Sequence, residues 1–97
     1  MRPDDIRTIL LSGAYHLAVT YSMRVRYGQI DDSINELPSL MLMQLSEHQS
    51  DDVLAEATNM FASLATTKAI TLRVNPHLQQ PAIERCEAIR DLVRPYL

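Results

Sequence analysis

The chain has few of the residues that turn or cross-link a backbone. Its 97 residues include two glycines, five prolines, one cysteine and no tryptophan. A β-rich fold of this length normally needs more turn residues, and an internal disulfide needs a second cysteine. A glycine-rich phosphate loop is also excluded, because Gly13 and Gly28 stand far apart. The sequence therefore predicts an all-α fold in a reducing compartment.

The chain also lacks a strong charge and a long apolar run. The net charge is −3, and no stretch approaches the roughly 18 apolar residues that a membrane span needs. The start, residues 1–5, lacks the basic-then-apolar order of a secretory signal. We expect a cytoplasmic protein that has no membrane partner and is not a general binder of nucleic acid.

Capping residues and helix breakers divide the chain into four expected helices. Pro3 and Gly28 bound the first, and Asn75 with Pro76 ends the third. Pro38 either precedes the second helix or lies in its first turn. The expected helices span 4–27, 34–48, 51–74 and 81–94. They predict one domain over residues 1–97, a small antiparallel three- or four-helix bundle that is dimeric.

The most distinctive pattern is a row of small side chains in the third expected helix. Its spacing of three and four residues places every member on one side of the helix. Small side chains let a second helix approach closely. The neighbour is either the first helix, across Gly13 and Ala14, or the same row in a second subunit. This small-residue ridge consists of Ala55, Thr58, Ala62, Ala65 and Ala69.

Apolar side chains also occur on helix faces that the monomer core does not need. Tyr15 belongs to a second apolar strip of the first helix, and Leu42 and Met43 point away from the main stripe of the second. With the ridge, they predict a partner or dimer interface. We therefore expect a non-enzymatic regulatory module that binds another protein or itself as a homodimer, such as an adaptor, a chaperone-like protein or an inhibitor.

The side chains able to do chemistry are isolated from one another. Cys86 lies on the apolar stripe of the last helix, where a free cysteine acts as a small hydrophobe. The histidines have no second ligand at metal-binding spacing, and the aspartate pairs stand where helices begin. We expect no catalytic residue, no cofactor and no metal. The histidines are His16, His48 and His77, and the pairs are Asp31–Asp32 and Asp51–Asp52.

Two other functions stay open at this point. A dimeric DNA-binding regulator would use basic side chains near the C-terminal ends of helices, which cluster if the first and third helices run parallel. A small helical enzyme or ligand-binding bundle would have its site in the core, near His16 or Cys86. The basic side chains in question are Arg24, Arg26, Lys68 and Arg73.

Overall fold

The computed structural model describes residues 2–97, in which every regular element is a helix. The all-α prediction is confirmed. The α-helices are α1 (Pro3–Arg26), α2 (Glu36–Leu45), α3 (Asp52–Ala65), α4 (Ala69–Val74) and α5 (Gln79–Val93). Single 3₁₀ turns join or end them: η1 (Asp32–Asn35), η2 (Ser46–His48), η3 (Pro76–Leu78) and η4 (Arg94–Tyr96).

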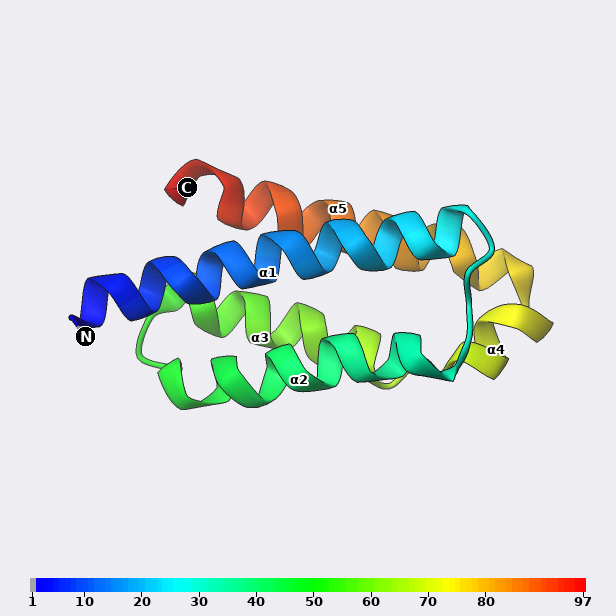
Figure 1. The fold of residues 1–97 in the computed structure, drawn as a ribbon, viewed down its shortest axis with the longest axis horizontal. Helices are drawn as coiled ribbons and strands as arrows, with labels where there is room; N and C mark the ends of the chain where they lie inside the picture. Colours follow the sequence, from blue (N-terminus) through cyan, green and yellow to red (C-terminus); the bar gives the residue numbers. More distant parts are fainter. Residues whose placement is uncertain (1) are drawn as a thin grey trace.

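The four longer helices lie along the long axis of a molecule that measures 43 × 22 × 18 Å (Figure 1). Along the chain they run in alternating directions, so α1 and α3 share one direction while α2 and α5 share the other. α1 packs along α5, and α2 packs along α3. The ends of α1 and α5 that carry the termini lie at one end of the molecule, and α4 lies at the other.

α1 ends where the sequence predicts, at a glycine. Gly28 has a φ of +72°, the left-handed conformation that glycine adopts without a steric penalty. The amide of Gly28 donates to the Val25 carbonyl, and the amide of Gln29 donates to the Arg24 carbonyl. These two bonds form a Schellman motif, which satisfies carbonyls at the helix end and turns the chain toward α2.

The single helix predicted over 51–74 is wrong, because the chain breaks into α3 and α4 at Thr66–Lys68. The Thr66 hydroxyl donates back to the Ser63 carbonyl, and Lys68 is extended, with φ −81° and ψ 154°. β-Branched residues that bond to the backbone compete with helix propagation. The new helix is then capped from a distant segment, since the Asn35 side-chain oxygen accepts from the Ala69 amide at 2.9 Å.

The second helix is shorter than the predicted 34–48. Asp31 caps the preceding turn η1, because its carboxylate accepts from the amide of Ser33. Pro38 lies buried within the first turn of α2, where its missing amide proton costs no helical hydrogen bond. The last part of the predicted range is the 3₁₀ turn η2.

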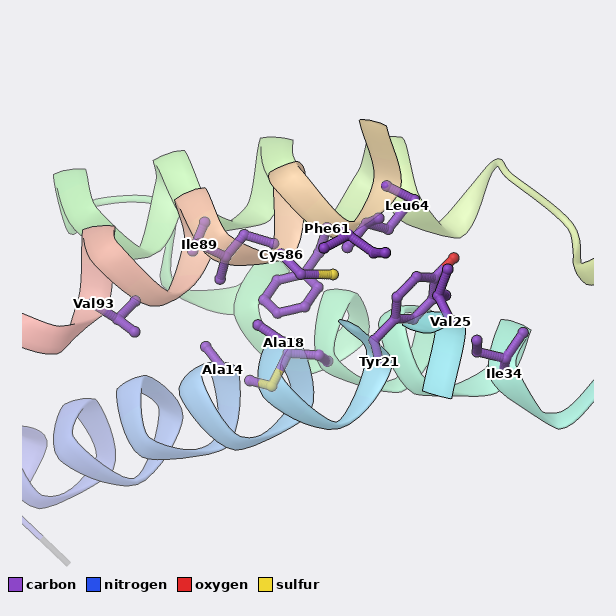
Figure 2. Close-up of a cluster of buried hydrophobic side chains, with 14 of the residues drawn as sticks. Ala14, Ala18, Tyr21, Val25, Ile34, Phe61, Leu64, Cys86, Ile89 and Val93 are labelled. Carbon is purple, nitrogen blue, oxygen red and sulfur yellow. The ribbon is translucent and has the colours of Figure 1, made fainter. Parts of the chain in front are cut away.

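The core lies between the helices and is shown in Figure 2. Phe61 of α3 and Tyr21 of α1 are its largest fully buried side chains. Ala14 and Ala18 of α1 are completely buried, and α1 packs more extensively on α5 than on any other helix. Because their side chains are small, the backbones of the two helices can come close together.

Removing the cap on α4 should destabilise the protein. We expect Asn35→Ala to lower the free energy of unfolding by about 1 kcal/mol, because the Ala69 amide loses its acceptor. Urea unfolding followed by circular dichroism measures the change. Asn59→Ala, at an exposed position of α3, is the control and should change little. Equal stability of the two variants would show that the cap contributes nothing.

Candidate interaction surface

The small-residue ridge is divided between two helices, and α2 covers the part on α3. Thr58 accepts a hydrogen bond from the Gln49 side chain, in the connection that leads from α2 to α3, at 2.9 Å. This side of α3 therefore faces α2, and helical spacing places Ala55, Ala62 and Ala65 on the same side. All three are only partly buried. These contacts indicate α2 as the neighbour of the ridge, whereas the first helix and a second subunit were the neighbours expected.

Ala69 does not belong to the ridge. It begins α4, after the break, and is fully buried inside the chain. A side chain with no exposed surface cannot contact a second molecule unless the fold opens. The five-residue ridge predicted on a single helix is therefore wrong at this end.

The other predicted interface residues have different environments. Tyr15 is half-buried against the core, with its ring edge-on to His16 at 5.7 Å between centroids. Leu42 is half-buried, whereas Met43 is 68% exposed. Of the three, Met43 is therefore the one that leaves most of its apolar surface free for a partner.

α1 presents an outward stripe that the sequence analysis missed. Ile9 is 56% exposed and Met23 is 49% exposed, and His16 and Thr20 between them are exposed as well. Helical spacing places these four side chains on one side of α1, opposite the buried Ala14. No charged residue occurs anywhere from 8 to 23. An outward helix face without charge is unusual in water and is typical of a covered surface.

α2 continues this surface. Gly13 of α1 lies beside the sulfur of Met41, so the two helices are in direct contact. Leu40 is 57% exposed and stands with Met43 on the outward side of α2, and residues 37–46 are also uncharged. We define the α1–α2 face as Ile9, His16, Thr20, Met23, Leu40 and Met43.

The missing charges could have revealed this face from the sequence. Ile9 and Met23 look like core residues when only hydrophobicity is counted. The uncharged stretches 8–23 and 37–46 are each several helical turns long. A helix that contributes only one stripe to the core normally has charges on its opposite side. Their absence in two adjacent helices is the more informative pattern.

The basic residues do come to one end of the molecule, because α1 and α3 run in the same direction (Figure 1). Three of the four already have partners within the chain. Arg24 pairs with Asp31 at 2.9 Å and Arg26 with Glu87 at 2.8 Å. Arg73 donates to a backbone carbonyl at 2.6 Å. These contacts use part of the hydrogen-bonding capacity of the side chains that a phosphate backbone would need.

A depression of about 550 Å³ lies beside the C-terminal end of α1. It is open to solvent and has a mixed lining, with amides and a guanidinium next to apolar side chains. A smaller depression of about 230 Å³ lies between the end of α3 and the start of α5. Neither is lined by a histidine, a cysteine or a carboxylate. The larger is lined by Val25, Arg26, Tyr27, Pro76, Gln79, Gln80 and Ile83.

The thiol and the phenol of the core are held neutral. Burial raises the pKa of Cys86 to about 12, and the nearby Arg85 only partly opposes this. Burial raises the pKa of Tyr21 to about 12 as well, and Cys86 adds to the effect. Cys86 is therefore a weak nucleophile at neutral pH. His16 is on the outer surface, so it does not share a site with Cys86.

One carboxylate of each aspartate pair, Asp31 and Asp51, has structural partners. Asp51 caps α3 by accepting from the amides of Val53 and Leu54, and it accepts from the Arg7 side chain at 2.6 Å. The bond from Arg7 is the main reason why the pKa of Asp51 is lowered. Within residues 2–97, no three histidine, cysteine or acidic side chains are grouped as metal ligands.

Comparisons with protein-family models, with curated proteins and with solved structures find no match for this chain. In the part of the chain that the structure describes, no helix has both the length and the apolar character needed to cross a membrane. The fold and the surface define an all-helical protein with an uncharged apolar face on two adjacent helices. Its function is therefore argued from that face.

Enlarging a ridge residue should weaken the fold. We expect Ala62→Leu to lower the free energy of unfolding by about 1–3 kcal/mol, because α2 occupies the space that the larger side chain needs. Chemical denaturation measures the loss, with Asn59→Leu on the exposed side of α3 as the control. A fully stable Ala62→Leu protein would show that this side of α3 is open.

The buried phenol makes a second stability prediction. The Tyr21 hydroxyl has no hydrogen-bond partner among the described residues. An unpaired buried hydroxyl has lost its water without compensation. We expect Tyr21→Phe to raise the free energy of unfolding by about 1 kcal/mol in urea denaturation. Tyr27→Phe, at an exposed position, should change nothing. A loss of stability in Tyr21→Phe would mean that the hydroxyl makes a favourable contact.

Proposed function

We propose that this chain is a non-enzymatic, cytoplasmic protein-interaction module, and that its four longer helices work as an antiparallel bundle whose α1–α2 face binds a protein. It acts by covering a surface of its partner, as an adaptor, a chaperone-like protein or an inhibitor does. The observation that carries the proposal is the exposed apolar area on two neighbouring helices that contain no charge in residues 8–23 and 37–46.

The size of this area supports a binding role. Ile9, Met23, Leu40 and Met43 each expose about half or more of their surface. Burying one such side chain completely is worth about 1.5–3 kcal/mol. Four half-exposed chains therefore supply several kcal/mol, from which the cost of association must be subtracted. The result is useful but moderate affinity, as expected for a regulatory contact.

The core chemistry is also consistent with a binding module. Cys86 is buried and neutral, and the depressions contain no acid, base or nucleophile pair of the kind that catalysis uses. The internal bonds of Arg24, Arg26 and Arg73 favour a protein partner over DNA.

Charge placed on the face should abolish binding without unfolding the protein. We expect Met23→Glu and Leu40→Glu to stay within about 0.5 kcal/mol of wild-type stability, because both sites are half-exposed. Quantitative affinity capture from a cell extract compares each variant with wild type. Asn59→Glu on α3 adds the same charge outside the face and should keep every partner. Partner binding that survives both face variants would contradict the proposal.

A further inference from the structure

The outward side of α1 has a symmetric pattern centred on His16. Ile9 lies seven residues before His16 and Met23 lies seven residues after it, so all three occupy one stripe. All three are exposed. If a second copy of α1 lies antiparallel with a two-fold axis at His16, each Ile9 meets the Met23 of the other copy. The stripe is thus complementary to itself, as a two-fold interface requires.

The residues next to the centre allow such helices to come close. In the same antiparallel arrangement, Ser12 lies opposite Thr20, and Gly13 lies opposite Val19. Ser12 and Thr20 have small side chains and Gly13 has none, so Val19 is the largest of the four. Small side chains at a helix crossing permit an interaxial distance near the short end of the usual range, about 8 Å. The bulkier apolar contacts are then placed on both sides of the crossing.

The charges at the ends of α1 favour the antiparallel direction. The helix begins with the exposed carboxylates Asp4 and Asp5 and ends with the basic residues Arg24 and Arg26. An antiparallel pair brings Asp4 and Asp5 of one copy to the basic end of the other, with the exposed Arg2 next to them and Arg7 already paired with Asp51. The Arg26 side chain is 49% exposed even though it pairs with Glu87, so it can accept a second acidic neighbour. A parallel pair would instead oppose like charges.

α2 supplies the area that α1 alone lacks. A helix as long as α1 has a footprint of about 400 Å², whereas a stable interface needs about 800 Å² from each partner. Gly13 of α1 lies beside Met41 of α2, and the two helices run in opposite directions. Three residues further along α1, His16 therefore lies at about the same height as Pro38, three residues earlier in α2. The same axis therefore brings Leu40 of each copy near Leu37 and the exposed Glu36 of the other.

We propose that the α1–α2 face binds a second copy of this chain, antiparallel, with the two-fold axis at His16. The inference rests on the proposed function, since it names the partner of the same face. The contacts are mainly apolar, and no charged side chain of α1 lies near the axis. On α2, the exposed Glu36 lies two residues from the level of the axis. The association is a concentration-dependent equilibrium between monomer and dimer.

A charge-pairing experiment tests the geometry. Sedimentation velocity over a range of concentrations compares wild type with two double variants, Ile9→Lys/Met23→Lys and Ile9→Lys/Met23→Glu. In the first, both outer contacts oppose like charges, and the dimer should weaken more than about a hundredfold. In the second, both contacts pair opposite charges, and the affinity should stay within about tenfold of wild type. Circular dichroism checks that each variant is helical.

Two outcomes of sedimentation overturn the proposal. If wild type is monomeric up to millimolar concentration, the chain does not dimerise. If both double variants lose the dimer equally, the helices do not pair antiparallel, because a parallel pair opposes like charges in both variants. The capture experiment with Met23→Glu separates these results from the proposed function: a monomer that loses its captured partners on that substitution still has a binding face.

A cross-link provides a second measurement that needs no folded double variant. A residue on a two-fold axis lies next to its own copy, so His16→Cys should form a disulfide-linked dimer under mild oxidation. Cys86 is 1% exposed and does not compete. Asn59→Cys, exposed on α3 outside the face, is the matched control and should stay monomeric. Equal cross-linking of the two variants contradicts an axis at His16.

Discussion

The packing of α1 on its two neighbours determines what the rest of this molecule can do. Ala14 and Ala18 are fully buried, and Figure 2 shows both in the core with Ile89 and Val93 of α5. Gly13 lies beside Met41 of α2. Two sides of α1 are therefore used inside the chain, and the remaining side necessarily faces outward. That side has Ile9 and Met23 where a solvated helix would have charges.

The position of the ridge changes where a partner has to be sought. Thr58 is bonded to Gln49, and α2 covers the small residues of α3, so close helix packing through this ridge takes place within the chain. The exposed apolar surface lies instead on the outward sides of α1 and α2. Small residues thus mark an internal contact here, whereas missing charge marks the surface. The protein-binding hypothesis is kept, but the proposed site leaves α3 and lies on the outward sides of α1 and α2, where it still includes Met43.

Local patterns in the sequence were enough for the all-helical class and for most helix ends. Gly28 ends α1 by adopting the left-handed conformation, which depends only on the residue itself. The spacing of apolar residues by three and four positions, which indicates helices, is also a local pattern. The break before α4 was not predictable in this way. It depends in part on Asn35, which caps the Ala69 amide from a segment far away in the chain. The neighbour of the ridge was equally undetermined, because any helix can pack on small side chains.

The most direct test of the account is an isotope-filtered nuclear Overhauser experiment on a mixture of labelled and unlabelled chains. Ile9 and Met23 lie about 21 Å apart along α1, too far for a contact within one molecule. An antiparallel dimer gives a cross-peak between the methyl groups of Ile9 on one copy and Met23 on the other, and this cross-peak weakens on dilution. A concentrated sample that gives no such cross-peak, while other methyl contacts are seen, would contradict the account.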